Sequence, residues 1–195
     1  MSNNRLEGAR AGFAIARILS RKCLSRGGRD LNDLNLSQNK IQDAGLTFIV
    51  HELLQHGNEL ETLNLAYNEI IDLKMPYNLE MIYDKNFAVT NLNLNGNKFR
   101  IAAHKQFASL FLLAGPLTQL SMKACNLENE GLITTFEALK EQRRLKFLDF
   151  SSNSIFDRGI EGICPFIEDK HFKSHIEVIR FDKNDISDRG FKRFI

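Results

Sequence analysis

Six segments of the chain alternate apolar and polar residues, and each ends in one more apolar residue at a fixed spacing. Alternation over a few residues is typical of a strand with one buried face, because successive side chains point to opposite sides. Between the segments, apolar residues recur every three or four positions, which is typical of a helix with one buried face. The pattern therefore predicts alternating strands and helices. The segments begin at Leu31, Leu60, Val89, Leu117, Leu145 and Ile176.

The six segments are copies of one motif, LxxLxLxxNxL, with apolar residues at positions one, four, six and eleven. The fourth-position residues of successive copies lie 28 to 31 residues apart, a period found in leucine-rich repeats. On this motif, residues 31–195 resemble leucine-rich-repeat proteins of the ribonuclease-inhibitor-like type. The resemblance implies an α/β solenoid, a horseshoe arc of about six repeats, with parallel strands on the concave face and helices on the convex face.

The period also places the individual elements along the chain. Helical patterns follow Ala44, His104, Gly131 and Gly159. Glycine recurs at one phase of the repeat, at positions 45, 131, 159 and 190, and each is expected to form a tight turn into a helix. Strands are expected near residues 33–37, 62–66, 91–95, 119–123, 147–151 and 178–182.

Two prolines interrupt this plan. The connection after the second strand contains Pro76, so its helix is expected to be short and to begin after that residue. In the fifth repeat, Pro165 is expected to begin or bend the helix. The irregular segment around Pro76 has two interpretations, a tolerated loop variation or a contact with a partner.

The ninth residue of the motif is polar, although the chain turns inward there. A buried N–H or C=O group without a partner costs roughly 1–3 kcal/mol, and an amide side chain both donates and accepts. We therefore expect a structural ladder in which each amide satisfies backbone groups of the neighbouring turn, with a buried structural thiol in the fourth copy. The ladder comprises Asn39, Asn68, Asn97, Cys125, Asn153 and Asn184.

Positions three, five and seven are expected to face solvent on the concave face, the surface that solenoids commonly use for binding. Asn35, Asn64 and Asn93 should stack as exposed amides, because neighbouring strands lie about 4.8 Å apart. Phe147 is expected to anchor a protein partner, unless these side chains merely solvate the sheet. The predicted partner-binding residues are Asn64, Asn91, Asn93, Asn95, Gln119, Lys123, Phe147, Asp149 and Arg180.

The two ends of the chain carry different signals. Residues 1–30 are basic, and Ile15, Ile18, Leu19 and Cys23 share one helical face, which predicts a basic N-terminal capping helix before the repeat domain 31–195. An arginine-rich transit peptide is the alternative. The last repeat stops within a helix pattern. Either the chain is a fragment without its C-terminal cap, or this uncapped end makes a self-association or assembly contact.

Composition excludes several classes of protein. With 43% hydrophobic residues, 26% charged residues and a net charge of +2, the chain is neither disordered nor basic enough to predict a nucleic-acid partner. No apolar run reaches the roughly 18 to 20 residues that a membrane helix needs. The three cysteines lack a CxxC pair, which predicts reduced thiols in the cytoplasm rather than zinc or disulfides. Association with the cytoskeleton and delivery into a host cell are alternative locations.

No acid, base and nucleophile share a plausible face, and the five histidines fall outside the concave strands. No catalytic residue, metal or cofactor is therefore predicted. The chain is interpreted as a non-catalytic interaction module that binds a protein partner, of unknown identity, through its concave face. The alternative is a permanent structural subunit of a large assembly, cytoskeletal or axonemal, held through its ends. The resemblance leaves a bacterial effector or a GTPase-activating-protein-like regulator as lesser alternatives.

Overall fold

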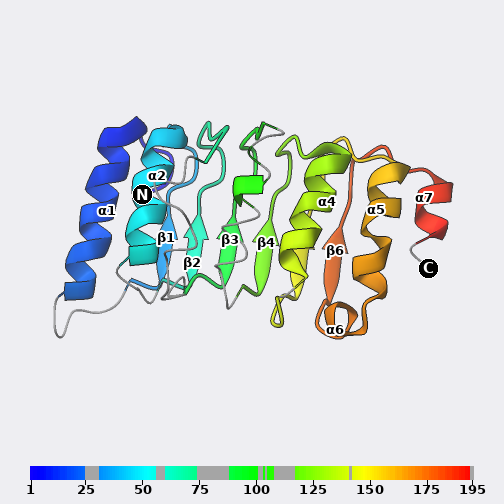
Figure 1. Cartoon of the computed structure of the whole chain (residues 1–195). Coiled ribbons are helices and arrows are strands. Elements are labelled where there is room, and N and C mark those ends of the chain that lie inside the picture. Colours follow the sequence, from blue (N-terminus) through cyan, green and yellow to red (C-terminus); the bar gives the residue numbers. More distant parts are fainter. Residues whose placement is uncertain are drawn as a thin grey trace.

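A single parallel sheet runs the length of the molecule, with its strands in chain order (Figure 1). The computed structural model describes residues 1–24, 31–55, 60–73, 88–100, 103, 105–107, 117–140 and 142–193. The six strands are β1 (Asp33–Asn35), β2 (Thr62–Asn64), β3 (Asn91–Asn93), β4 (Gln119–Ser121), β5 (Phe147–Asp149) and β6 (Val178–Arg180). Each strand pairs in register with the next, so that Leu34 lies opposite Leu63 and Leu63 opposite Leu92. The predicted α/β solenoid of parallel strands is confirmed.

The strands span three residues instead of the five predicted, and the chain leaves the extended conformation at position eight of every motif. The residue there has a positive φ, between 55° and 71°. Glycine adopts this left-handed conformation most readily, yet only one of the six positions carries glycine. Pairing between repeats still continues past the strands, as the Leu36 N–H donates to the Asn64 carbonyl at 2.8 Å. The position-eight residues are Gln38, Tyr67, Gly96, Ala124, Ser152 and Lys183.

Helices line one side of the sheet (Figure 1). They are α1 (Gly8–Leu24), α2 (Gln42–Gln55), α4 (Glu128–Leu139), α5 (Asp157–Glu168), α6 (Lys170–Lys173) and α7 (Asp188–Lys192). Helix α1 packs on α2, α4 on α5, and α5 on α7. The helix expected after Pro76 lies outside the described residues, and of the helix expected from His104 only Ala103 and residues 105–107 are described as helical.

The fifth repeat differs from its prediction. Pro165 lies inside α5 and therefore does not begin the helix, while the alternative that it bends the helix stays a prediction. The chain instead breaks at Asp169, whose ψ of 125° is extended, and then forms the short helix α6. The single helix expected from Gly159 is thus two helices with a corner between them.

The core lies between the sheet and the helices. The leucines at position four of the first five repeats are buried together with apolar side chains of α2, α4 and α5. Aromatic pairs extend this core, with ring centroids 4.2 Å apart for Phe99 and Phe107 and 5.5 Å apart for Phe136 and Phe150. In β6, Ile179 is only half-buried, because no described strand covers the outer side of the last repeat.

Helix α1 packs closely against α2 through two glycines. A Cβ atom added to Gly12 would collide with the backbone of Gly45, so the two helix backbones lie in contact there. This contact turns Ile15 and Leu19 into the core, since they lie three and seven residues after Gly12. Ile18 lines the same hollow as Ile15 and Leu19, as their shared helical face predicted, but it is 39% exposed. The capping role of residues 1–30 stays a prediction.

Candidate functional site

Each ninth-position asparagine makes four or five hydrogen bonds, which join its own turn to the preceding one. The Asn97 Oδ1 accepts from the Asn68 N–H at 2.9 Å and from the Ile70 N–H at 3.2 Å. Its Nδ2 donates to the Leu65 carbonyl at 2.9 Å and to the Leu94 carbonyl at 2.8 Å. Four of the five asparagines are buried, and the remaining one is half-buried in the last repeat, where no described turn follows it. The buried ones are Asn39, Asn68, Asn97 and Asn153.

Cys125 fills the same position with a thiol. Its Sγ donates to the Leu94 carbonyl at 3.2 Å, but it offers no amide oxygen to the preceding turn. The Phe99 N–H therefore donates to the Cys125 backbone carbonyl instead, at 3.0 Å. Burial raises the pKa of the Cys125 thiol to about 12, so the group is neutral and unreactive near pH 7.

The first residues of the chain reproduce the second half of a repeat. The Asn4 and Leu6 N–H groups donate to the Asn39 Oδ1 at 3.0 Å and 3.3 Å, as residues of later repeats do to later asparagines. The Asn4 Nδ2 in turn donates to the Met1 and Ser2 carbonyls. The repeat motif was not extended to these residues, although the string NRL, followed by a helix, resembles the NKI that begins at Asn39.

A second row of side-chain acceptors, which the sequence analysis also missed, lies at position thirteen of the motif. The Asp43 Oδ1 accepts from the Ile71 N–H at 2.7 Å, and the Asp157 carboxylate accepts from the Ser187 N–H at 2.8 Å. Asn129 makes the equivalent bond to the fifth repeat at 2.9 Å. Hydrogen bonds from the Ser187 hydroxyl and backbone lower the pKa of Asp157. Each of these acceptors ties one repeat to the next.

This second row explains the recurring glycines. A Cβ atom on Gly159 would lie 2.6 Å from the Asn129 Oδ1, and one on Gly190 would lie 2.5 Å from the Asp157 Oδ1. Both glycines lie within the first turn of a helix, and neither has a positive φ. The expectation of a tight turn was therefore wrong for these two residues, and also for Gly45 in α2 and Gly131 in α4, which lack a positive φ too. Gly159 and Gly190 are glycine because the acceptor of the preceding repeat needs the space.

The opposite face of the sheet, which we call the open face, carries positions three, five and seven. In register across the strands, Thr62, Asn91, Gln119 and Phe147 form one row, and Asn64, Asn93, Ser121 and Asp149 form the next. The structure therefore brings all nine predicted partner-binding residues to this face or to the turns that follow its strands. Gln119, Lys123 and Arg180 are exposed, and the remaining residues except Asp149 are half-buried.

The amides of the open face are held in one orientation. The Asn64 Oδ1 accepts from the Ala66 N–H and the Asn93 Oδ1 from the Asn95 N–H, each at 3.0 Å. An N–H donor fixes the amide oxygen toward itself, so the Nδ2 groups point away from the backbone. Within the part of the chain that the structure describes, neither of these two Nδ2 groups has a hydrogen-bond partner. They form a row of donors that is available to a ligand.

Two further amides on the open face have the same orientation, with the oxygen bound by the protein and the amino group unbound among the described residues. The Asn91 Oδ1 accepts from the Thr118 hydroxyl at 2.9 Å. The Asn95 Oδ1 accepts from the Ser121 hydroxyl and from the Lys123 N–H, both at 2.7 Å. The oxygens are thus occupied by the protein itself, while the amino groups stay unused among the described residues.

The C-terminal part of the open face has a different chemistry. The Arg180 guanidinium lies over the Phe147 ring, 5.3 Å from its centroid, in a cation–π contact. Asp149 is only 8% exposed, and its Oδ1 accepts from the Ser151 N–H at 2.9 Å. Asp149 is therefore less accessible than predicted, because the adjoining chain covers its carboxylate. The amide row ends next to an aromatic ring with a cationic neighbour.

None of the histidines that the structure describes lies on the open face. His51 lies in α2, His171 in α6 and His175 in the turn after it, while His56 and His104 lie outside the described residues. Among the residues that the structure describes, no group of three or more His, Cys, Asp and Glu side chains is arranged to hold a metal ion.

A comparison with protein families bears on two of the repeats. A family model described as Leucine Rich repeat matches residues 29–50 and 143–164. The first match contains β1 and the start of α2, and the second contains β5 and the start of α5. Both matches thus fall on the unit that the structure repeats. The chain is built of leucine-rich repeats.

This leucine-rich-repeat protein also resembles a longer one. It is 29% identical over 150 residues to "NACHT, LRR and PYD domains-containing protein 4E" of Mus musculus. The alignment covers 76% of this chain and 15% of the mouse protein, so the chain corresponds to a small part of its relative. Leucine-rich-repeat domains generally mediate protein–protein interaction. The ribonuclease-inhibitor-like type stays a prediction, and no described helix is long and apolar enough to cross a membrane.

Proposed function

We propose that this leucine-rich-repeat protein is a non-catalytic interaction module that binds a protein partner through the open face of its sheet. The row of outward amide donors at Asn64 and Asn93 carries the proposal. The oxygens accept from backbone N–H groups at 3.0 Å, which leaves the Nδ2 groups to donate to a ligand. The fitting partner offers acceptors at the spacing of neighbouring strands, about 4.8 Å. Carboxylate side chains of a partner can meet this requirement, for example from positions three or four apart on a helix, whose Cβ atoms lie about 5–6 Å apart.

The ring of Phe147 supplies the apolar part of the proposed surface. It is half-buried between neighbouring strands and has Arg180 over it, so its conformation is restrained before binding. Aromatic and arginine side chains are enriched among the residues that dominate interface energies. A partner would therefore place an apolar group on Phe147 and its acceptors on the amide row.

The test replaces the outward hydrogen-bond donors by acceptors while keeping the hydrogen bonds to the backbone. In the double variant Asn64→Asp and Asn93→Asp, a carboxylate oxygen still accepts from the backbone N–H, but an acceptor replaces the outward donor. The matched control is Asn32→Asp with Asn126→Asp, two exposed residues off the amide row that change the net charge equally. Partners recovered from the native cells by affinity capture and quantified by mass spectrometry should be lost with the first pair and kept with the second.

Phe147→Ala gives an independent arm of the test, expected to weaken capture of the same partners at least about tenfold. Partners that persist unchanged in the Asp double variant and in Phe147→Ala would overturn binding through the open face. Equal loss in the control pair would show that added negative charge, rather than the amide row, is responsible.

A permanent structural subunit is a second candidate, and one observation favours it. The last described repeat leaves Val178 and Phe191 40% and 51% exposed, on a repeat whose Phe181 is half-buried. A second subunit covering these side chains would hold the protein in an assembly. Charge introduced by Phe191→Glu, on α7 and away from the open face, should then release the protein from a large complex, whereas binding through the amide row would survive.

A further inference from the structure

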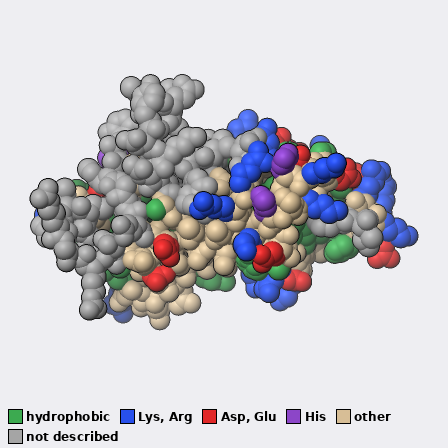
Figure 2. All heavy atoms as spheres, turned by 90° about the horizontal axis from the view of Figure 1, so that it is seen from below, with side chains coloured by type: hydrophobic (Ala, Val, Ile, Leu, Met, Phe, Trp, Pro, Cys, Tyr) green, Lys and Arg blue, Asp and Glu red, His purple; other side chains and the backbone are tan. Residues whose placement is uncertain are grey.

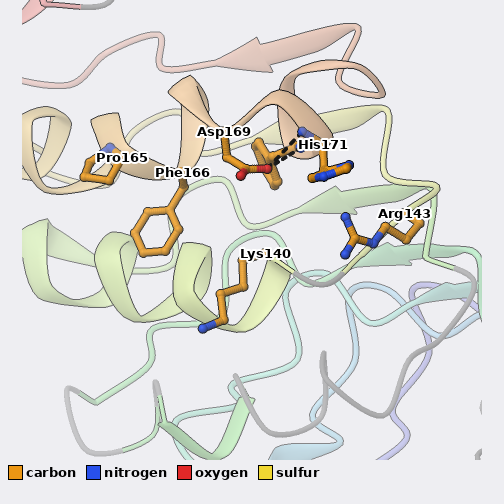
Figure 3. Close-up of a pocket in the computed structure, with 7 residues that line it drawn as sticks. Lys140, Arg143, Pro165, Phe166, Asp169 and His171 are labelled. Atoms are coloured by element: carbon orange, nitrogen blue, oxygen red, sulfur yellow. Dashed lines mark hydrogen bonds between the residues drawn. The ribbon is translucent and has the colours of Figure 1, made fainter.

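A pocket of about 250 Å³ opens on the helix side of the molecule, where the end of α4 meets the corner between α5 and α6 (Figure 3). None of its lining residues belongs to a strand, so the pocket is separate from the open face. The lining residues are Lys140, Arg143, Pro165, Phe166, Asp169, His171 and Phe172.

The corner that forms the pocket is held by Asp169. This residue precedes α6, and its Oδ1 accepts from the N–H groups of His171 at 2.9 Å and Phe172 at 3.0 Å (Figure 3). The N–H of Phe172 is the main cause that lowers the pKa of Asp169, so the carboxylate stays ionised and keeps both bonds. Pro165 lines the same corner shortly before α5 ends. The shape of the pocket is thus fixed by local hydrogen bonds.

Aromatic rings give the pocket an apolar floor. Phe172 is buried, and its ring centroid lies 5.6 Å from that of Phe136 in α4. The Phe166 ring lies 6.3 Å from the same Phe136. Phe136 in turn contacts Phe150 in the core, so the floor is part of the packed interior. A side chain that enters the pocket would meet rings that are already held in place.

The rim of the pocket is cationic. Lys140 caps the end of α4 and is exposed, Arg143 follows it in the chain, and Asp169 is the only carboxylate among the lining residues. Within the described chain, neither the Lys140 ammonium nor the His171 ring has a hydrogen bond or ion pair. Figure 2 views the molecule from the side of α6, and there Lys and Arg side chains gather around histidines in the half that contains α5 and α6.

The volume and charge of the pocket indicate the kind of ligand. Pockets for small molecules and cofactors measure roughly 300–1,000 Å³, so this one suits a single bulky side chain better. We propose that the pocket accepts an aromatic side chain of a protein partner, and that acidic residues flanking this side chain pair with Lys140 and Arg143. Ring contacts with Phe166 and Pro165 favour an aromatic group, and the cationic rim selects carboxylates beside it.

Binding of short labelled peptides to the full chain tests this site. The probe is a fluorescein-labelled peptide with one phenylalanine flanked on both sides by glutamates, measured by fluorescence anisotropy. Saturable binding is expected. A peptide with alanine in place of phenylalanine should bind at least about tenfold more weakly, and one with lysine flanks should not bind.

Variants of the rim separate the pocket from the general positive charge around it. Lys140→Glu with Arg143→Glu should weaken binding of the phenylalanine peptide at least about tenfold. The matched control is Lys170→Glu with Lys173→Glu, which changes the net charge equally on α6 but at residues that do not line the pocket. The control should weaken binding less than about threefold. Unchanged circular dichroism shows that both variants remain folded.

Several outcomes would overturn the proposal. These are the absence of saturation at about 1 mM peptide, equal binding of the alanine peptide, or equal loss in the control variant. Displacement of the labelled peptide by adenosine monophosphate at a lower concentration than by unlabelled peptide would assign the pocket to a free aromatic anion instead. The open face is not involved in any of these measurements, so they stand apart from the function proposed for it.

Discussion

Replacing Asn97 by alanine tests the asparagine ladder most severely, because this side chain is fully buried. The substitution removes the acceptor of the Asn68 and Ile70 N–H groups, which lie 2.9 Å and 3.2 Å from the Asn97 Oδ1. It also removes the donor to the carbonyls of Leu65 and Leu94. The expected loss of stability depends on which of these four groups are left without a partner.

The two carbonyls keep other donors in Asn97→Ala. The Leu65 carbonyl still accepts from the Asn68 Nδ2 at 2.9 Å, and the Leu94 carbonyl accepts from the Cys125 Sγ at 3.2 Å. The two N–H groups lose the Oδ1, and an unsatisfied buried group costs about 1–3 kcal/mol, so the expected loss is about 2–6 kcal/mol. Since domains are stable by about 5–15 kcal/mol, this is a large part of the total.

Equilibrium unfolding in urea, followed by circular dichroism, measures the effect as a lower midpoint. Asn184→Ala is the matched control, because Asn184 makes the same four bonds in the last repeat but is only half-buried. Water can replace its bonds, so we expect its loss to be smaller, at about 1–2 kcal/mol. Equal losses in the two variants, or a loss below about 1 kcal/mol in Asn97→Ala, would refute the reasoning.

Three further predictions concern other parts of the repeat. Gly96→Ala should destabilise the protein by about 1–2 kcal/mol, because Gly96 has a φ of 71° and its new Cβ would collide with the Tyr67 ring. An equal loss when the same substitution is made in a Tyr67→Ala variant would show that the collision contributes nothing and that only the strained backbone does. Gly190→Ala should lower the melting temperature despite the better helix propensity of alanine, because the Cβ displaces Asp157; a higher melting temperature would contradict this. Folding raises the pKa of the Cys125 thiol from its ordinary value of 9.0 to about 12, so its contribution to stability is fully present below pH 9.0 and is lost as the pH rises toward about 12. The free energy of unfolding in urea should therefore fall over this pH range in the original protein, and this part of the fall should be missing in a Cys125→Ala variant.

The motif alone predicted most of the fold, because each leucine of the motif marks a position whose side chain is buried. Positions four and six are buried in the first five repeats, within the strand and directly after it, and the strand register followed from the period. The open face was predictable for the same reason, since residues beside a buried leucine must point away from the core. The orientation of Asn64 and Asn93 was not, because it depends on an N–H group two residues further along the chain.

Features that depend on contacts between distant residues could not be predicted. Ile18 fits an apolar helical face as well as Ile15 does, and only the contact of Gly12 with Gly45 decides which of them is buried. From the sequence, Gly190 fits a turn, and only its contact with Asp157 of the preceding repeat shows why the residue is glycine. In such cases the sequence pattern is compatible with more than one packing, and the neighbouring repeat decides between them.

Side-chain amide signals in a nitrogen-15 NMR spectrum would test binding through the open face most directly. The Nδ2 groups of Asn64 and Asn93 can be assigned by their disappearance in the two Asn→Asp variants. On addition of a partner recovered from native cells, these two signals should shift or broaden, while the Nδ2 signal of Asn126 should stay in place. Saturable binding with both signals unchanged would contradict the proposed interface.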